Sequence, residues 1–146
     1  MIAIDTNVLL RHILQDDAKQ SPEASQLIED HTEVLITDIV LVESLWTLLG
    51  KKYQASREDI ITLINSLIAE PAIKFENPQA IWAALSDFQE KRAQYAADGR
   101  KLKLPDFADA LIINKAKLIA KQSNENLAAV YTFDAGALRI AGTRQP

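Results

Sequence analysis

The sequence contains no cysteine and only four glycines among its 146 residues. Without cysteine there is no disulfide framework and no thiolate metal site, which fits a reducing compartment. The few glycines form none of the patterns GxSxG, GxxxxGK[ST] or GxGxxG. The sequence therefore offers neither a nucleophile elbow nor a glycine-rich loop that cradles phosphates or dinucleotides.

Long apolar runs are absent as well. No uninterrupted apolar segment approaches the ~18 residues that a membrane helix needs. The N-terminal MIAIDTNVLL is apolar, but it carries Asp5 and has no basic flank, so we do not expect it to be a signal peptide. These features predict a cytoplasmic protein that does not associate with a membrane.

Composition predicts a globular protein. Apolar residues make up 48% of the chain and charged residues 25%, which allows a sizeable core, and the length suits one domain over residues 1–146. The net charge of −4 argues against general binding to nucleic acids, because contacts with phosphate need lysine and arginine. Local basic clusters could still make such contacts.

Short apolar segments alternate with segments of helical periodicity. Strands are expected at 1–4, 33–37, 72–76 and 128–133, and helices at 6–15, 21–31, 38–50, 56–70, 78–99 and 105–122. We predict that Ser21 and Asp38 cap two of these helices, and that Ser56 with Asp59 forms a capping box on a third. Such alternation predicts an α/β domain with a mainly parallel central sheet, in which ligands bind at the carboxyl ends of the strands.

Two acids directly follow predicted strands. Asp5 comes after MIAI, and Asp134 comes after AAVYTF, so both are expected at the ligand-binding edge of the sheet. Each could instead cap the helix that follows it. Asn7, close to Asp5 in sequence, is suited to orient a carboxylate or to bind water on a metal ion.

Three further acids lie on predicted helices. Glu43 has apolar neighbours one turn away on both sides, so we expect its side chain on a buried face, where a carboxylate needs a partner. That partner would be either an arginine or lysine, or a metal ion. Asp106 and Asp109 share one helical face. Asp106 suits the cap or the helix dipole, whereas Asp109 precedes an apolar run and is the better candidate for chemistry.

Several carboxylates cannot all be ionised close together unless cations lie between them. Oxygen ligands of this kind suit Mg²⁺ or Mn²⁺, and such ions support hydrolysis of phosphate esters by activating water. A phosphatase with Asp5 as nucleophile, as in the haloacid dehalogenase class, would need a second aspartate where this chain has Asn7. His12 and His31 lie on predicted helices and are better explained by solvation or packing than by catalysis.

Four motifs occur in a familiar order: IDTNVLL, VLVESLWTL, LPDFADALII and VYTFD. Together they resemble the PIN-domain ribonucleases, especially toxins of the VapC type, over nearly the whole chain. The resemblance implies a three-layer α/β/α sandwich whose acids meet at the carboxyl edge of a parallel sheet. The chain departs from the family pattern in its brief ending, LRIAGTRQP.

The resemblance also implies which residues act. The catalytic acids and ligands of Mg²⁺ or Mn²⁺ would be Asp5, Glu43, Asp109 and Asp134, with Asp106 as an additional ligand and with Thr6 and Asn7 in support. The substrate would be RNA, commonly tRNA or rRNA. A small antitoxin would hold the enzyme inactive, and a homodimer would be expected. The alternative within the same fold is a PIN-like module that binds without catalysis.

Two basic segments are candidates for contact with RNA phosphates. GRKLKLP places Arg100, Lys101 and Lys103 just before Asp106, and Lys51 and Lys52 follow Gly50. Lysine and arginine supply most of the positioning contacts to nucleic-acid backbones. A solvated surface role would explain the same residues.

Overall fold

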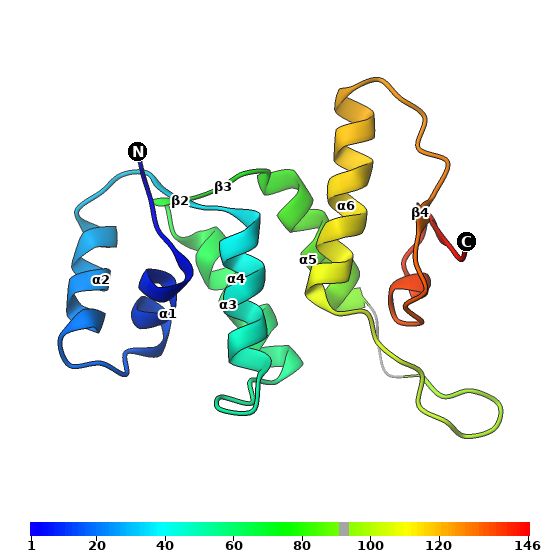
Figure 1. The fold of residues 1–146 in the computed structure, drawn as a ribbon, viewed down its shortest axis with the longest axis horizontal. Helices are drawn as coiled ribbons and strands as arrows, with labels where there is room; N and C mark the ends of the chain where they lie inside the picture. The colour runs from blue at the N-terminus through cyan, green and yellow to red at the C-terminus, as the bar shows by residue number, and fades with distance from the viewer. Residues whose placement is uncertain (91–93) are drawn as a thin grey trace. The chain divides into compact units, whose positions relative to one another are not determined.

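The computed structural model describes residues 1–90 and 94–146. The chain divides into two compact units, unit 1 (Met1–Glu76) and unit 2 (Asn77–Pro146), and each is described by itself (Figure 1). No helix among the described residues is long and apolar enough to cross a membrane.

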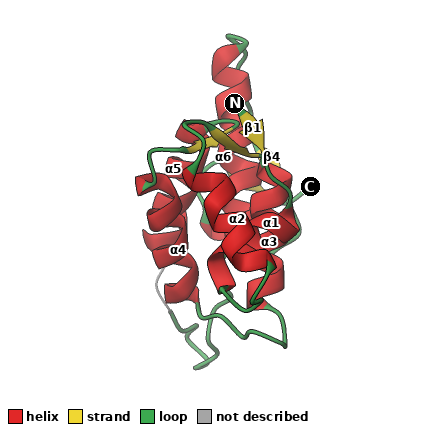
Figure 2. Cartoon of the chain, turned by 90° about the vertical axis from the view of Figure 1, so that its left-hand side faces the viewer, coloured by secondary structure: helices red, strands yellow, loops and turns green. Residues whose placement is uncertain are grey.

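Unit 1 is built from three short strands and four helices, and Figure 2 shows how short the strands (yellow) are beside the helices (red). In chain order they are β1 (Ile2–Ala3), α1 (Thr6–Leu14), α2 (Gln20–Glu29), β2 (Val34–Ile36), α3 (Asp38–Leu49), α4 (Arg57–Ala69) and β3 (Ile73–Phe75). Strands and helices therefore alternate as their sequence patterns predict.

The three strands form a parallel sheet in the order β1-β2-β3. Ile2 pairs with Val34, which in turn pairs with Ile73. Val34 and Ile36 are fully buried, as expected for apolar strands that helices cover. Because β1 and β2 run in the same direction, the turn at Asp5 and the start of α3 lie at the same edge of the sheet.

The caps of three helices in unit 1 test the sequence predictions. The capping box is confirmed, since Ser56 Oγ accepts from the Asp59 amide and Asp59 Oδ2 accepts from the Ser56 amide. The prediction for Ser21 is wrong, because α2 begins at Gln20 and Ser21 is buried within its first turn. Asp17 Oδ1 instead accepts from the Gln20 amide at 2.7 Å.

The prediction that Asp38 caps the third helix is also wrong. The cap of α3 is Thr37, whose hydroxyl accepts from the Val40 amide at 3.4 Å, and Asp38 is the first helical residue. There its charge still favours the positive end of the helix dipole. Sequence preference alone does not separate two adjacent residues that both suit a helix start.

Unit 2 contains two helices, a short 3₁₀-helix and two strands. These are α5 (Pro78–Glu90), α6 (Phe107–Gln122), β4 (Val130–Tyr131), the 3₁₀-helix η1 (Ala137–Arg139) and β5 (Thr143–Arg144). Phe88 of α5 and Phe107 of α6 pack edge to face with ring centroids 5.9 Å apart. Asn114 of α6 donates to Asp87 of α5 at 2.8 Å, so an apolar contact and a polar contact join the two helices.

The second pair of strands is also parallel. Val130 pairs with Thr143, and Tyr131 pairs with Arg144. The brief ending of the chain therefore supplies a last strand, β5, despite its departure from the family pattern. Parallel pairing in both units, together with the alternating helices, confirms the predicted α/β class.

The helix predicted for 78–99 is shorter than expected. The described part of α5 covers Pro78–Glu90, and 91–93 lie outside the described residues. From 94 the chain is not helical, because Tyr95 forms an antiparallel bridge with Lys101 and the Ala96 amide donates to the Arg100 carbonyl at 2.8 Å. Gly99 has a φ of 85° and lies in this turn, where glycine carries no steric penalty.

Candidate functional site

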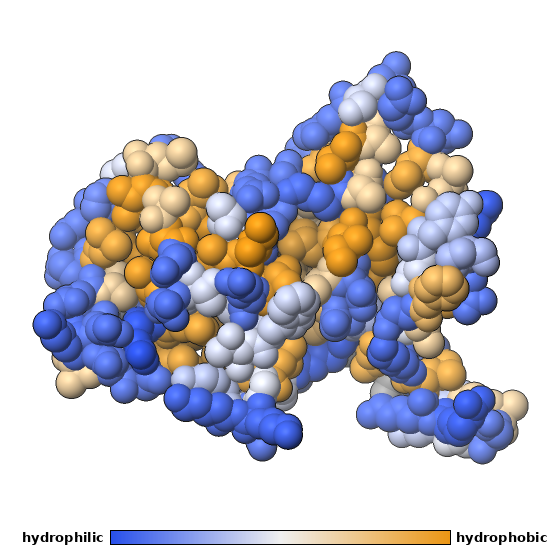
Figure 3. Space-filling model, in the orientation of Figure 1, coloured by the Kyte–Doolittle hydropathy of each residue, from blue (hydrophilic) through white to orange (hydrophobic). Residues whose placement is uncertain are grey.

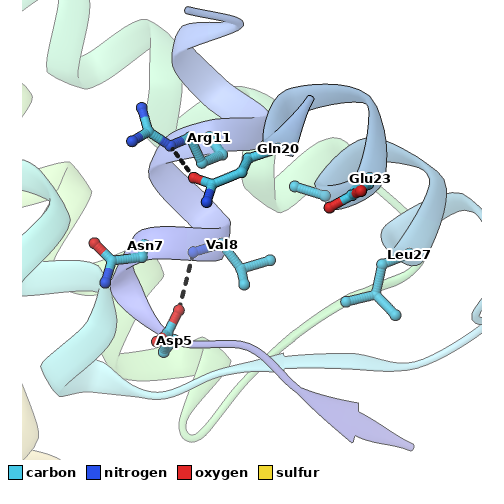
Figure 4. A pocket seen from close by; sticks show the side chains of 8 residues that line it. Asp5, Asn7, Val8, Arg11, Gln20, Glu23 and Leu27 are labelled. Atoms are coloured by element: carbon cyan, nitrogen blue, oxygen red, sulfur yellow. Dashed lines mark hydrogen bonds between the residues drawn. The ribbon is translucent and has the colours of Figure 1, made fainter. Parts of the chain in front are cut away.

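The turn after β1 carries Asp5, Thr6 and Asn7. Asp5 caps α1, since its Oδ1 accepts from the Val8 amide at 2.9 Å (Figure 4). The capping alternative is therefore confirmed, but it uses one carboxylate oxygen only. Asp5 and Asn7 are both exposed, so a ligand can reach this turn.

Glu43 lies on the second turn of α3, and the expectation that it is buried is wrong. Glu43 is exposed, and its neighbours Ile39 and Trp46 are 71% and 60% exposed. The opposite side of α3 faces the core through Leu41, Leu45 and Leu48. Because the side chain lies in water, it needs no buried arginine or lysine as partner.

A threonine connects Glu43 to the turn after β1. Thr6 Oγ1 donates to Glu43 Oε2 at 2.6 Å. Thr6 is adjacent to Asp5 in the chain, so this hydrogen bond holds the second acid of the predicted set close to the first. The parallel pairing of β1 with β2 is what brings α1 and α3 to the same edge.

In unit 2, Asp106 is the cap of α6. Its Oδ1 accepts from the Asp109 amide at 2.7 Å, so the capping alternative is confirmed here too. Asp109 is half-buried, in the first turn of the same helix. The geometry therefore agrees with the prediction that Asp106 and Asp109 share one face.

Asp109 is the electrostatically perturbed acid of unit 2. Burial, followed by the charges of Asp106 and Asp134, raises the pKa of Asp109 to about 6 from its usual 3.8. Both causes disfavour the ionised form. A divalent cation beside these carboxylates would reverse the balance, because it would favour ionisation.

Asp134 lies at the start of η1. Its Oδ1 accepts from the Ala137 amide at 2.9 Å, which holds the carboxylate near the first residue of η1, although the N-cap of η1 is Gly136. Its Oδ2 binds the Lys103 ammonium. The hydrogen bond from Lys103, followed by that from Ala137, holds the pKa of Asp134 below its usual value.

Lys103 is the cation among the acids of unit 2. The hydrogen bond to Asp134 raises its pKa, and the charges of Asp109 and Asp106 act in the same direction. The sequence predicts contact of Lys103 with RNA phosphate, and it contains no local signal for the pairing with Asp134, since the two residues are 31 apart in the chain. Its contact with phosphate stays a prediction.

The other basic candidates fall in two segments of the chain, one in each unit. Arg100 forms an ion pair with Asp98 at 2.6 Å, and Lys101 is exposed in the same loop of unit 2. Lys51 and Lys52 follow α3 in unit 1 and are exposed. The Lys52 ammonium lies 5.2 Å from the centre of the Tyr53 ring.

Three further residues, His12, His31 and Arg11, lie outside the predicted set of acids. His12 Nδ1 bonds to Ser25 and His31 Nδ1 bonds to the Leu27 carbonyl, in agreement with a packing role. Arg11, one turn after Asn7 on α1, lies in the wall of a pocket that also includes Asp5. The four-residue spacing from Asn7 was the available signal for Arg11.

The donor chemistry suits a hard divalent cation, because every candidate ligand is a carboxylate, hydroxyl or amide oxygen. Within the described part of either unit, no three histidine, cysteine or carboxylate side chains come close enough together to hold a metal ion. In unit 2, the raised pKa of Asp109 and the ion pair of Asp134 with Lys103 show that the three carboxylates interact with one another and with a cation.

The PIN domain family model matches residues 2–143, which is nearly the whole chain and spans both units. The chain therefore belongs to the PIN domain family. PIN domains are in general metal-dependent nucleases that act on RNA, so membership indicates a nuclease. Comparison with curated proteins finds no match.

Proposed function

We propose that this protein is a metal-dependent endoribonuclease of one domain, residues 1–146, that hydrolyses phosphodiester bonds in RNA. The observation that carries the proposal is the interaction among the carboxylates of unit 2. Burial, followed by the charges of Asp106 and Asp134, raises the pKa of Asp109, and the Lys103 ammonium binds Asp134. A protein without a cation to bind would gain little from keeping such repulsion.

Asp5, Glu43, Asp109 and Asp134 are the proposed catalytic acids and ligands of Mg²⁺ or Mn²⁺, with Asp106 as an additional ligand. When bound, the metal ion supplies activation of water and neutralises charge on the phosphate. Three of the carboxylates are held by backbone amides at the start of a helix, at Val8, Asp109 and Ala137. This fixes the direction of each carboxylate before a ligand binds.

Thr6 and Asn7 are proposed to position the ligands in unit 1. Thr6 donates to Glu43 at 2.6 Å, which limits the rotamers of an otherwise exposed side chain. Asn7 is exposed beside Asp5, and its amide can bind water near the metal. Arg100, Lys101, Lys103, Lys51 and Lys52 remain candidates for weak contacts with the RNA backbone.

We also propose that the protein is the toxin of a type II toxin–antitoxin pair, that it acts in the cytoplasm and that it cuts tRNA or rRNA. In this proposal it forms a homodimer, and a small antitoxin holds it inactive. The resemblance to VapC-type toxins motivates this. Ile39, Trp46 and Leu49 are exposed on α3, and Figure 3 shows apolar residues gathered on the visible face of each unit. Exposed apolar surface of this kind favours a protein partner.

Two other functions predict different results. A PIN module that binds without catalysis would show no carboxylate-dependent metal binding. A phosphatase of the dehalogenase class would form a phospho-aspartate on Asp5, and Asn7 argues against it because that class needs an aspartate there.

The proposed activity is tested on total RNA. Induced expression of the wild-type chain should create new RNA ends and stop growth, while expression of Asp5→Asn should do neither. Purified protein should cut RNA with Mg²⁺ or Mn²⁺, and the activity should disappear on addition of EDTA. Cleavage that persists in EDTA would contradict the metal-dependent mechanism.

Lys103→Met should strengthen binding of Mn²⁺. Lys103 and the metal ion compete for Asp134, so removal of the ammonium should raise metal affinity about two- to fivefold, the scale of an exposed ion pair. Lys101→Met removes the same charge two residues away and should leave the affinity unchanged. Titration of both variants with Mn²⁺ at one ionic strength makes the comparison, and weaker binding by Lys103→Met would contradict it.

A further inference from the structure

Unit 1 has a groove between α1 and α2, with a volume of about 350 Å³. Asp5 forms part of its wall, so the groove opens beside a proposed metal ligand (Figure 4). Small-molecule sites occupy roughly 300–1,000 Å³. The groove therefore has room for a single nucleotide unit but not for a folded segment.

One side of the groove is apolar. Val8 of α1 and Leu27 of α2 line it, and Leu27 is 37% exposed. Figure 4 shows both side chains beside the same open space. A flat ring can cover such a surface, whereas a phosphate or a sugar alone would leave it in water.

The other side carries a fixed set of polar groups. Arg11 Nε donates to Gln20 Oε1 at 2.8 Å, and Arg11 Nη1 donates to Asp16 at 3.0 Å. Since the Gln20 oxygen is occupied by Arg11, its amide N–H groups remain as donors. Glu23 also lines the groove, and its carboxylate makes no side-chain hydrogen bond among the described residues.

We propose that this groove binds a guanine base of the RNA, in a nucleotide next to the scissile phosphate. Glu23 accepts from guanine N1–H and N2–H₂, the Gln20 amide donates to O6, and the ring packs on Val8 and Leu27. The inference rests on the proposed nuclease function for the RNA, while the groove itself is a feature of unit 1 alone.

Hydrogen-bond chemistry selects guanine among the four bases. A carboxylate only accepts, and it can accept two parallel bonds. On its Watson–Crick edge only guanine offers two adjacent donors, and O6 next to them is an acceptor. Adenine and cytosine place a ring acceptor next to the amino group, and uracil has a single donor. Any other base can donate only one hydrogen bond to Glu23 from this edge, and the loss of the second bond costs affinity.

Binding of mononucleotides tests the groove without any need for cleavage. GMP should bind about tenfold more tightly than IMP, which lacks only the 2-amino group, the scale of one hydrogen bond to a charged group. In Glu23→Gln this ratio should fall toward one. Glu29→Gln makes the same change at an exposed position of α2 outside the groove and should keep the ratio. Amide signals of Val8 and Leu27 should shift on GMP addition.

Equal binding of GMP and IMP by the wild-type protein, or no shift at Val8 and Leu27, would overturn the inference. So would binding of an arginine-containing peptide in the groove without binding of GMP, because that would indicate a protein partner. Sequenced cleavage ends separate the two proposals. Metal-dependent cleavage without guanine enrichment beside the cut would contradict the guanine site and leave the proposed nuclease function standing. GMP selectivity without metal-dependent cleavage would contradict the nuclease function and leave the guanine site standing.

Discussion

Asp5→Asn should reduce RNA cleavage by about 100-fold or more while the protein stays folded. Asn caps helices about as well as Asp, so the hydrogen bond from the Val8 amide is expected to remain. The negative charge that would hold a divalent ion is lost, and loss of groups at a metal centre costs activity on the order of 10–100-fold or more. Steady-state cleavage of a labelled RNA with Mn²⁺ measures the effect.

Two comparisons separate catalysis by Asp5 from its structural role. Asp5→Ala removes the cap as well and should also lower the free energy of unfolding, by about 1 kcal/mol. Asp30→Asn makes the same chemical change at an exposed residue whose side chain accepts a hydrogen bond from Gln26, and this variant should cut RNA normally. Full activity in a folded Asp5→Asn protein would remove Asp5 from the site.

Asp109→Asn should reduce RNA cleavage as much as Asp5→Asn does. The same change should stabilise the metal-free protein at neutral pH. The folded chain keeps a proton on Asp109 up to a pKa of about 6, whereas the unfolded chain loses it near 3.8. Between these values the folded state binds more protons than the unfolded state, so the free energy of unfolding falls as pH rises. Asparagine does not titrate, so the Asp109→Asn protein does not lose this part of its free energy of unfolding.

Thermal unfolding in EDTA measures the difference. The melting temperature of Asp109→Asn should exceed that of the wild type at pH 7.5, and the gap should nearly close at pH 3.5, where Asp109 is mostly protonated in both states. Glu125→Gln, which likewise removes a negative charge at an exposed position of unit 2, serves as the control. A variant that melts below the wild type at pH 7.5 would contradict the crowding of charge around Asp109.

Ionisation of Asp109 should also control the affinity of the protein for metal ions. A divalent ion needs the ionised carboxylate, so affinity for Mn²⁺ should fall as pH drops below about 6. Added metal should in turn restore the stability that the wild-type protein loses at neutral pH, because a ligand that binds only the folded state stabilises it.

The parallel strands could be predicted from the sequence because their signals are local. MIAI and EVLIT are short, apolar and bounded by polar residues, and they pair as β1 and β2. The capping box at Ser56 was found for the same reason, since both of its members lie within one turn. Ser21 failed because Asp17, four residues earlier, takes the amides of Lys19 and Gln20.

Burial of Glu43 could not be predicted from periodicity. The pattern shows which residues share a face of α3, but not which face meets the core. Ile39 and Trp46 made the Glu43 side look apolar, while Leu41 and Leu45 occupy the core. Choosing between the two faces requires the packing of α3 against its neighbours, which the local sequence does not contain.

The non-helical segment from residue 94 and the pairing of Asp134 with Lys103 could not be predicted, for related reasons. Nothing in the sequence after Glu90 breaks a helix before Gly99, so the bridge between Tyr95 and Lys101 carries no local signal. Lys103 is 31 residues from Asp134. Long-range pairs of this kind follow from the fold and not from spacing along the chain.

Asp5 and Asp109 are both proposed to take part in metal-dependent cleavage. The most direct test is titration with Mn²⁺ of the wild type, Asp5→Asn, Asp109→Asn and the double variant. We predict that each single change weakens binding at least about tenfold, because each removes a charged oxygen that would hold the ion, and that the double variant binds no more tightly than either single variant. Wild-type affinity in either single variant would contradict the claim.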